Sequence, residues 1–265
     1  MAGLVESPKL GMTKREALSN IPVMVIYTCS IYTGSKALSQ LPIPIFVCLH
    51  NILLPIMILG RLAFAGQMPS VRVWLSASLL IVSTFAAGFS LSIDDWTPYW
   101  WMLAHISSAA FYHLYRLRSD CCLHEGKIAH IFQCYLFSVL VLAPASVFLG
   151  DALAAQSFPL LYFYRFYVGC VISGFLGALL QLYVIRLEDG KAAASLCSNT
   201  EYQHVVSKVV AVPLSFLTFD DLDTSKPLLP WMMVNLGASV ALSCWKPASE
   251  GDAGATTATR ENTLL

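Results

Sequence analysis

Long apolar segments restrict the fold that this chain can adopt. A helix that crosses a bilayer needs about 20 mostly apolar residues. Eight segments of the sequence meet that requirement: residues 21–38, 42–62, 73–91, 98–115, 128–149, 160–185, 192–219 and 228–245. Only 12% of the 265 residues are charged, whereas about 25% is usual for a soluble domain. We therefore expect an all-α, polytopic membrane helix bundle of about eight transmembrane helices.

Polar sequence flanks the apolar segments. Residues 1–20 lack the apolar region and the small-residue cleavage site of a secretory signal, so we expect a cytosolic N-terminal segment, and we expect the first transmembrane helix to direct targeting. Residues 21–245 form the predicted transmembrane domain. Residues 246–265 are rich in Gly, Ala, Thr and Ser, which predicts a disordered cytosolic tail.

Basic residues in the loops predict the orientation in the membrane, because Lys and Arg near short loops are retained in the cytosol. One predicted side carries Lys9, Lys14, Arg15, Arg61, Arg72, Arg116, Arg118, Lys127, Arg186, Lys191, Lys246 and Arg260. The opposite side carries Lys226, surrounded by aspartates. Both termini are therefore predicted to be cytosolic.

Three basic residues lie in or at the edge of predicted spans, namely Lys36, Arg165 and Lys208. Ionisable groups in such segments are costly unless partnered, and they mark functional sites by default. Lys208 lies in the middle of its segment. Lys36 is near a helix end and Arg165 lies among tyrosines, so that extension of either side chain to the membrane interface is an alternative to ligand contact.

Polar residues without a positive charge also occur in two segments. Asn51 follows His50 inside the second segment, where a hydrogen bond between neighbouring helices is the alternative to a substrate contact. Glu201 precedes Lys208 by two helical turns, which places both on one helix face. The polar first half of the seventh segment predicts a water-filled cavity at its cytosolic end, or else a long loop and a short span that starts near Val205.

Several classes of function are excluded by what the sequence lacks. The formal net charge is zero and no basic cluster stands out, so we expect no nucleic-acid partner. The cysteines show no CxxC pair and several lie in apolar runs, so we expect no metal site. No protease or hydrolase motif and no P-loop occurs, which predicts neither an enzyme nor a cofactor. Buried basic residues instead favour an anionic, phosphate-bearing substrate.

Small residues and prolines predict features of helix packing. Gly169, Gly174 and Gly177 would allow another helix to approach closely. The prolines expected to kink or break helices are Pro42, Pro44, Pro55, Pro144 and Pro213. Bent or broken helices around a site near the membrane midplane are typical of secondary transporters.

Three stretches resemble the nucleotide-sugar transporters of the drug/metabolite transporter superfamily, and among these solute carrier family 35, subfamily D. They are SKALSQLPIPIFVCLHN (Ser35–Asn51), FPLLYFYRFYVGCVISGFLG (Phe158–Gly177) and YLFSVLVLA (Tyr135–Ala143). GDP-mannose transporters carry a run similar to IYTGSKAL at Ile31–Leu38. The resemblance covers residues 21–245.

This resemblance implies an antiporter of the Golgi membrane that moves UDP-N-acetylglucosamine into the lumen in exchange for UMP, with the endoplasmic reticulum left open as its location. Members of the family have ten helices in two inverted halves, so we expect a truncated inverted repeat that lacks the first two helices. The halves would rock around a cavity in which Lys208 and Lys36 neutralise the diphosphate. Asn51 and Tyr135 would form hydrogen bonds with the sugar or base, and Tyr164 would stack.

Two alternatives remain open at this stage. A GDP-mannose carrier, or a carrier of another phosphorylated metabolite, is the first. However, the GALNK signature of GDP-mannose transporters retains only Lys208 here, and their FYNN signature, near Tyr135, retains neither asparagine. The second is a truncated, non-transporting partner subunit. The sequence also leaves open whether the protein forms a homodimer.

Overall fold

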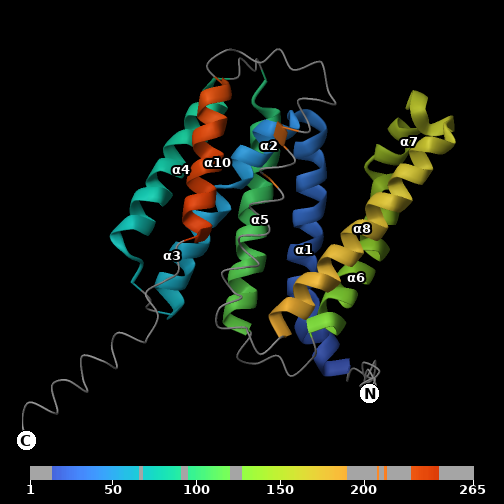
Figure 1. The fold of residues 1–265 in the computed structure, drawn as a ribbon. Helices are drawn as coiled ribbons and strands as arrows, with labels where there is room; N and C mark the ends of the chain where they lie inside the picture. Colours follow the sequence, from blue (N-terminus) through green and yellow to red (C-terminus); the bar gives the residue numbers. More distant parts are fainter. Residues whose placement is uncertain are drawn as a thin grey trace, which may run out of the picture. The chain divides into compact units, whose positions relative to one another are not determined.

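Helices make up almost all of the chain that the structure describes. The computed structural model describes residues 14–65, 68–90, 95–119, 127–189, 208, 212–213 and 228–244, and no strand occurs among them. Its elements are α1 (Lys14–Gln40), α2 (Ile43–His50), α3 (Leu53–Ala65), α4 (Val71–Phe89), α5 (Thr97–Ser119), α6 (Lys127–Phe148), α7 (Asp151–Gln156), the 3₁₀ turn η1 (Pro159–Tyr162), α8 (Tyr164–Asp189) and α10 (Leu228–Cys244) (Figure 1). The prediction of an all-α fold is confirmed.

The predicted membrane segments coincide with these helices, except for the seventh. In the described part of the chain, three helical stretches are long and apolar enough to cross a membrane, namely Ile43–Phe64, which contains α2 and most of α3, Val71–Phe89 and His130–Phe148. Two shorter helices, Tyr164–Leu180 and Leu228–Leu242, are also apolar. The prediction of a polytopic helical membrane protein is therefore confirmed. Of the seventh segment only three residues are described, and residues 246–265 lie outside the described residues.

Contacts divide the chain into two compact units. The first unit comprises Met1–Lys36 and Leu103–Ala194, and the second comprises Ala37–Met102 and Ser195–Leu265. The boundaries therefore fall inside α1, after Lys36, and inside α5, after Met102. Each unit combines segments that are far apart in the sequence, so its side-chain contacts depend on tertiary packing.

The second unit is built around the pairing of α4 with α10, which lie side by side, and α2 contacts both (Figure 1). One cluster of its buried apolar residues consists of Val73, Ala77, Leu80, Ala238 and Leu242, with Leu54 and Ile58 packed against it. On α4 the core residues recur at intervals of three and four, the spacing that places side chains on one face of a helix. This face of α4 therefore holds α10.

Pro55 interrupts the second predicted segment. The segment was predicted as one helix over residues 42–62, but α2 ends at His50 and α3 begins at Leu53. Proline has no N–H to donate to the carbonyl four residues earlier, and its ring clashes with that carbonyl. Here that residue is Asn51, whose carbonyl instead accepts the N–H of Leu54 at 3.0 Å. The expectation of a break from Pro55 is confirmed.

The start of α5 is fixed by an aspartate in the preceding loop. The Asp95 carboxylate accepts the Thr97 hydroxyl at 2.7 Å and the Thr97 backbone N–H at 3.1 Å. These hydrogen bonds stabilise the ionised carboxylate and lower the pKa of Asp95, and the bond from the hydroxyl has the larger effect. One backbone N–H of the first helical turn, which has no partner within the helix, is satisfied in this way.

In the first unit, α1 and α5 approach closely at a glycine. The His105 ring on α5 lies against Gly34, and its Nδ1 is 2.9 Å from the Ser30 carbonyl oxygen. A Cβ at Gly34 would come within 2.8 Å of the ring. By contrast, a Cβ at Gly169, Gly174 or Gly177 would have no such neighbour within 4 Å. The close approach predicted at those three glycines is therefore not found, because the described residues place no other helix against them.

We expect Gly34→Ala to destabilise the protein, because the new methyl group would displace the His105 ring from its hydrogen bond. Forced overpacking costs about 1–3 kcal/mol, and this cost exceeds or offsets the gain in helix propensity of about 1 kcal/mol for alanine over glycine. Thermal unfolding of the purified protein in detergent measures the change.

Gly174→Ala is the matched control, because a methyl group there meets open space and should leave the melting temperature unchanged or raise it. The cost of Gly34→Ala should disappear in a His105→Ala background. An equal cost in both backgrounds would show that the ring is not the obstacle.

Candidate polar site in the second unit

Asn51 lies at the break between α2 and α3 and is completely buried. Its Nδ2 donates a hydrogen bond of 2.8 Å to Oδ1 of Asn235 on α10. Asn235 is also completely buried. The bond links two buried amides that are far apart in the sequence. Buried amides are costly unless their hydrogen bonds are satisfied, so this pair fixes how α2 meets α10.

The amide of Asn235 continues to two hydroxyl groups on α4. Its Nδ2 lies 2.7 Å from Thr84 Oγ1 and 3.2 Å from Ser83 Oγ, and both residues are buried. The Thr84 hydroxyl in turn lies 2.8 Å from the carbonyl oxygen of Leu80. A connected polar group therefore joins α2, α10 and α4.

Lys208 completes this group from the seventh predicted segment. Its Nζ donates a hydrogen bond of 2.9 Å to Asn51 Oδ1, and the side chain is partly buried. Among the described residues, Lys208 has no carboxylate within ion-pair distance. Its partner is thus a neutral amide, which orients the ammonium group without cancelling its charge. Such a group attracts an anion, and phosphate oxygens are suitable acceptors for it.

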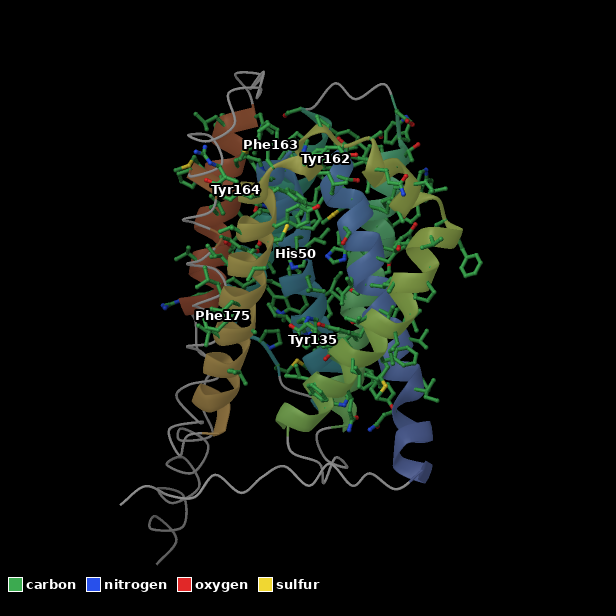
Figure 2. The ribbon with its side chains drawn as sticks, turned by 90° about the vertical axis from the view of Figure 1, so that its right-hand side faces the viewer. His50, Tyr135, Tyr162, Phe163, Tyr164 and Phe175 are labelled. Atoms are coloured by element: carbon green, nitrogen blue, oxygen red, sulfur yellow. The ribbon has the colours of Figure 1, made fainter. Side chains whose placement is uncertain are left out.

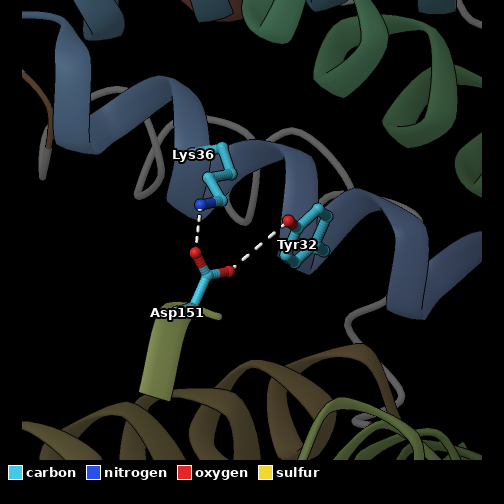
Figure 3. Close-up of polar contacts among 3 residues, drawn as sticks. All are labelled: Tyr32, Lys36 and Asp151. Carbon is cyan, nitrogen blue, oxygen red and sulfur yellow. Dashed lines mark hydrogen bonds and ion pairs between the residues drawn. The ribbon is translucent and has the colours of Figure 1, made fainter. Parts of the chain in front are cut away.

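Lys36 has a different environment, in the first unit. It forms an ion pair with Asp151, and Tyr32, one helical turn earlier on α1, has its hydroxyl 3.5 Å from the other carboxylate oxygen (Figure 3). Asp151 begins α7 directly after Gly150, whose φ of 80° lies in the left-handed region that glycine adopts without strain. The turn after α6 therefore presents the carboxylate to α1.

The remaining predicted site residues that are described belong to the first unit. Tyr135 on α6 is exposed and packs edge-to-face with Tyr27 of α1, with ring centres 5.8 Å apart. Tyr164 begins α8 beside Tyr162 and Phe163 (Figure 2), and the Arg165 guanidinium lies 6.0 Å from the centre of its ring. Glu201 lies outside the described residues.

The structure thus joins two predicted site residues, Lys208 and Asn51, by a direct hydrogen bond. It gives Lys36 a carboxylate partner, Asp151, that the sequence analysis did not single out. It also adds Asn235 and Thr84, which the sequence analysis missed. Asn235 is the single asparagine in residues 228–245, and an amide within an apolar segment is itself a signal.

Apolar helices that enclose a connected group of amides, hydroxyls and an ammonium define a polytopic helical membrane protein with a polar interior. No protein-family model matches the chain. Curated relatives do match. The chain is 32% identical over 232 residues to the mouse UDP-N-acetylglucosamine transporter TMEM241, covering 86% of the chain and 75% of that protein. It is 33% identical over 204 residues to the Xenopus laevis homolog of TMEM241, covering 75% of the chain and 66% of that protein.

The chain therefore belongs to the TMEM241 family of nucleotide-sugar transporters, and it spans about two thirds to three quarters of the length of these relatives. It is also 28% identical over 171 residues to a GDP-mannose transporter of Komagataella pastoris, covering 61% of the chain and 52% of that protein. All three relatives are named as transporters and not as enzymes, as expected from the lack of catalytic motifs.

The ion pair in the first unit leads to a prediction about stability. We expect Lys36→Met and Asp151→Asn each to lower the melting temperature, because each removes one partner of a partly buried pair. The melting temperature of the double variant should be no lower than that of the less stable single variant. A coupling of about 1 kcal/mol is expected for a pair that retains some exposure to solvent.

A double-mutant cycle followed by thermal unfolding in detergent checks this prediction. Tyr32→Phe is the control, because it keeps the ring and removes the hydroxyl beside the pair while Lys36 and Asp151 both remain. Additive effects of the two substitutions would show that the ion pair contributes nothing to stability.

Proposed function

We propose that this chain transports a nucleotide sugar across the Golgi membrane, and that UDP-N-acetylglucosamine enters the lumen in exchange for UMP. The names of the relatives support the substrate class. The observation that carries the proposal is the Lys208 ammonium, which a neutral amide holds within the polar group of the second unit. A substrate phosphate would supply the negative charge that no described residue brings within ion-pair distance of Lys208.

Phosphate binding by Lys208 follows from its surroundings. An ammonium in a site with little water interacts more strongly with an anion than it would in bulk solvent. Among the described residues Asn51 accepts one of its three N–H groups, which leaves two for phosphate oxygens. We propose that the diphosphate of the sugar nucleotide and the monophosphate of UMP bind here in turn. Exchange then requires that the site open to one side of the membrane at a time.

The other predicted residues take secondary roles in this proposal. Lys36 is a weaker candidate for phosphate binding than Lys208, because Asp151 already compensates its charge. Tyr135, Tyr164 and Arg165 also lie in the first unit, and their contact with the sugar or base stays a prediction. The role of Glu201 also stays a prediction, since it lies outside the described residues. Both termini are proposed to face the cytosol, because the basic loops lie on that side.

GDP-mannose is the second candidate substrate, since a yeast GDP-mannose transporter also matches the chain. Of the two signatures of GDP-mannose transporters, FYNN retains neither asparagine near Tyr135, and GALNK retains only its lysine, Lys208. The two candidates share the phosphate chemistry at Lys208 and differ in the base. An exchange assay with a uridine and a guanosine nucleotide sugar therefore distinguishes the two candidate substrates.

Proteoliposomes that contain this chain and are preloaded with UMP should take up radiolabelled UDP-N-acetylglucosamine, and those preloaded with GMP should not take up GDP-mannose. Lys208→Met should abolish uptake, because it removes the charge that binds phosphate. Lys208→Arg, which keeps the charge, is the matched control and should retain part of the uptake.

Uptake of GDP-mannose against GMP alone would replace the proposed substrate with the second candidate. Absence of exchange for every pair, by protein that unfolds cooperatively, would contradict transport by this chain. Full activity of a folded Lys208→Met variant would remove Lys208 from the site.

A further inference from the structure

The polar group of the second unit begins with an atom whose role in hydrogen bonding is fixed. A backbone carbonyl accepts hydrogen bonds and cannot donate them. The Thr84 hydroxyl lies 2.8 Å from the Leu80 carbonyl oxygen and 3.4 Å from that of Cys48. Its single hydrogen therefore points to a carbonyl, whichever of the two it serves. Toward Asn235, Thr84 offers only lone pairs.

This arrangement fixes the orientation of the Asn235 amide. An asparagine side chain carries a donor NH₂ and an acceptor oxygen, and its orientation follows from its partners. Because Thr84 and Ser83 accept at 2.7 and 3.2 Å, the NH₂ group of Asn235 faces α4. Its Oδ1 then faces α2. The Ser83 hydroxyl requires the same orientation of the Asn235 amide. Its hydrogen is directed to the Leu80 carbonyl oxygen at 3.0 Å, so it too offers only lone pairs to Asn235.

The orientation of Asn51 follows from that of Asn235. Oδ1 of Asn235 can only accept, so Asn51 directs its NH₂ group toward α10 and its own Oδ1 toward Lys208. A reversed Asn51 would place an NH₂ donor against an ammonium group, which can only donate. From Leu80 to Lys208, only one orientation of each amide therefore pairs every donor with an acceptor.

We propose that Thr84 and Asn235 are positioning residues for substrate binding: they hold Asn51 with its carbonyl oxygen toward Lys208, which keeps the ammonium group where the phosphate binds. This inference rests on the proposed function of Lys208. It differs from an ordinary bridge between helices, because such a bridge affects stability and leaves substrate affinity unchanged.

Thr84→Val tests the inference, since valine has the shape of threonine and lacks the accepting oxygen. We expect the KM for UDP-N-acetylglucosamine exchange to rise roughly tenfold, the scale expected for a weakened hydrogen bond to a charged group, with Vmax little changed. Thr84→Ser keeps the hydroxyl and should restore the wild-type KM.

Thr28→Val is the matched control. Thr28 is also buried, and its hydroxyl donates to the carbonyl four residues earlier, at 2.8 Å from Met24, as that of Thr84 does to Leu80. It belongs to the first unit and is not part of the series that ends at Lys208. The KM of Thr28→Val should equal that of the wild type. Equal KM values for Thr84→Val and Thr28→Val, or a fall in Vmax alone, would overturn the inference.

A second measurement does not depend on transport. The rate at which trinitrobenzenesulfonate labels Lys208, followed by mass spectrometry, should rise several-fold in Thr84→Val and not in Thr28→Val. Unchanged labelling would also overturn the positioning role. If the wild type shows no exchange, the proposed function fails, and the labelling rate still decides whether Thr84 positions Lys208. If the wild type exchanges and Lys208→Met keeps its KM, Lys208 is not part of the site and the positioning role is overturned while transport stands.

Discussion

A polar group inside a membrane segment has no water to bond with, so it must find its partners within the protein. In the second unit this requirement applies to Asn51, which lies at the break that Pro55 causes. The Asn51 carbonyl is satisfied locally by Leu54, but its side chain requires partners from other helices. Asn235 on α10, Thr84 on α4 and Lys208 supply them directly or through one another. The packing of α2, α4 and α10 and the candidate phosphate site therefore depend on the same hydrogen bonds.

The two lysines that the sequence analysis singled out illustrate how a partner determines a role. Lys36 is paired with a carboxylate, so its charge is compensated and its contribution to the fold of the first unit can be measured. Among the described residues, Lys208 is paired with an amide and with no carboxylate, so none of them compensates its charge. A neutral partner orients a cation without competing with a substrate anion. This difference, which spacing along the chain does not show, makes Lys208 the stronger candidate for phosphate binding.

Hydropathy predicted the helical class and the positions of the helices well, because about 20 apolar residues leave few other folds open. Pro55 was recognised as a breaker from its chemistry alone. The glycines of α8 were expected at a close helix contact, whereas the contact occurs at Gly34, since only tertiary structure brings His105 against it. For the same reason the pairing of Asp151 with Lys36 could not be predicted from the sequence. Asn51 and Lys208 were both selected from the sequence, but their direct bond, and the part played by Asn235 and Thr84, depend on residues more than 100 positions apart.

The affinity of UMP relative to uridine tests the central claim most directly, because the two ligands differ only in the phosphate. Isothermal titration of the purified protein with each ligand, for the wild type and for Lys208→Met, isolates the contribution of the lysine to phosphate binding. A hydrogen bond to a charged group contributes about 1.5–3 kcal/mol, so the wild type should bind UMP at least roughly tenfold more tightly than uridine. Lys208→Met should bind both ligands with the same affinity. A preference for UMP that is unchanged in a folded Lys208→Met variant would contradict the account.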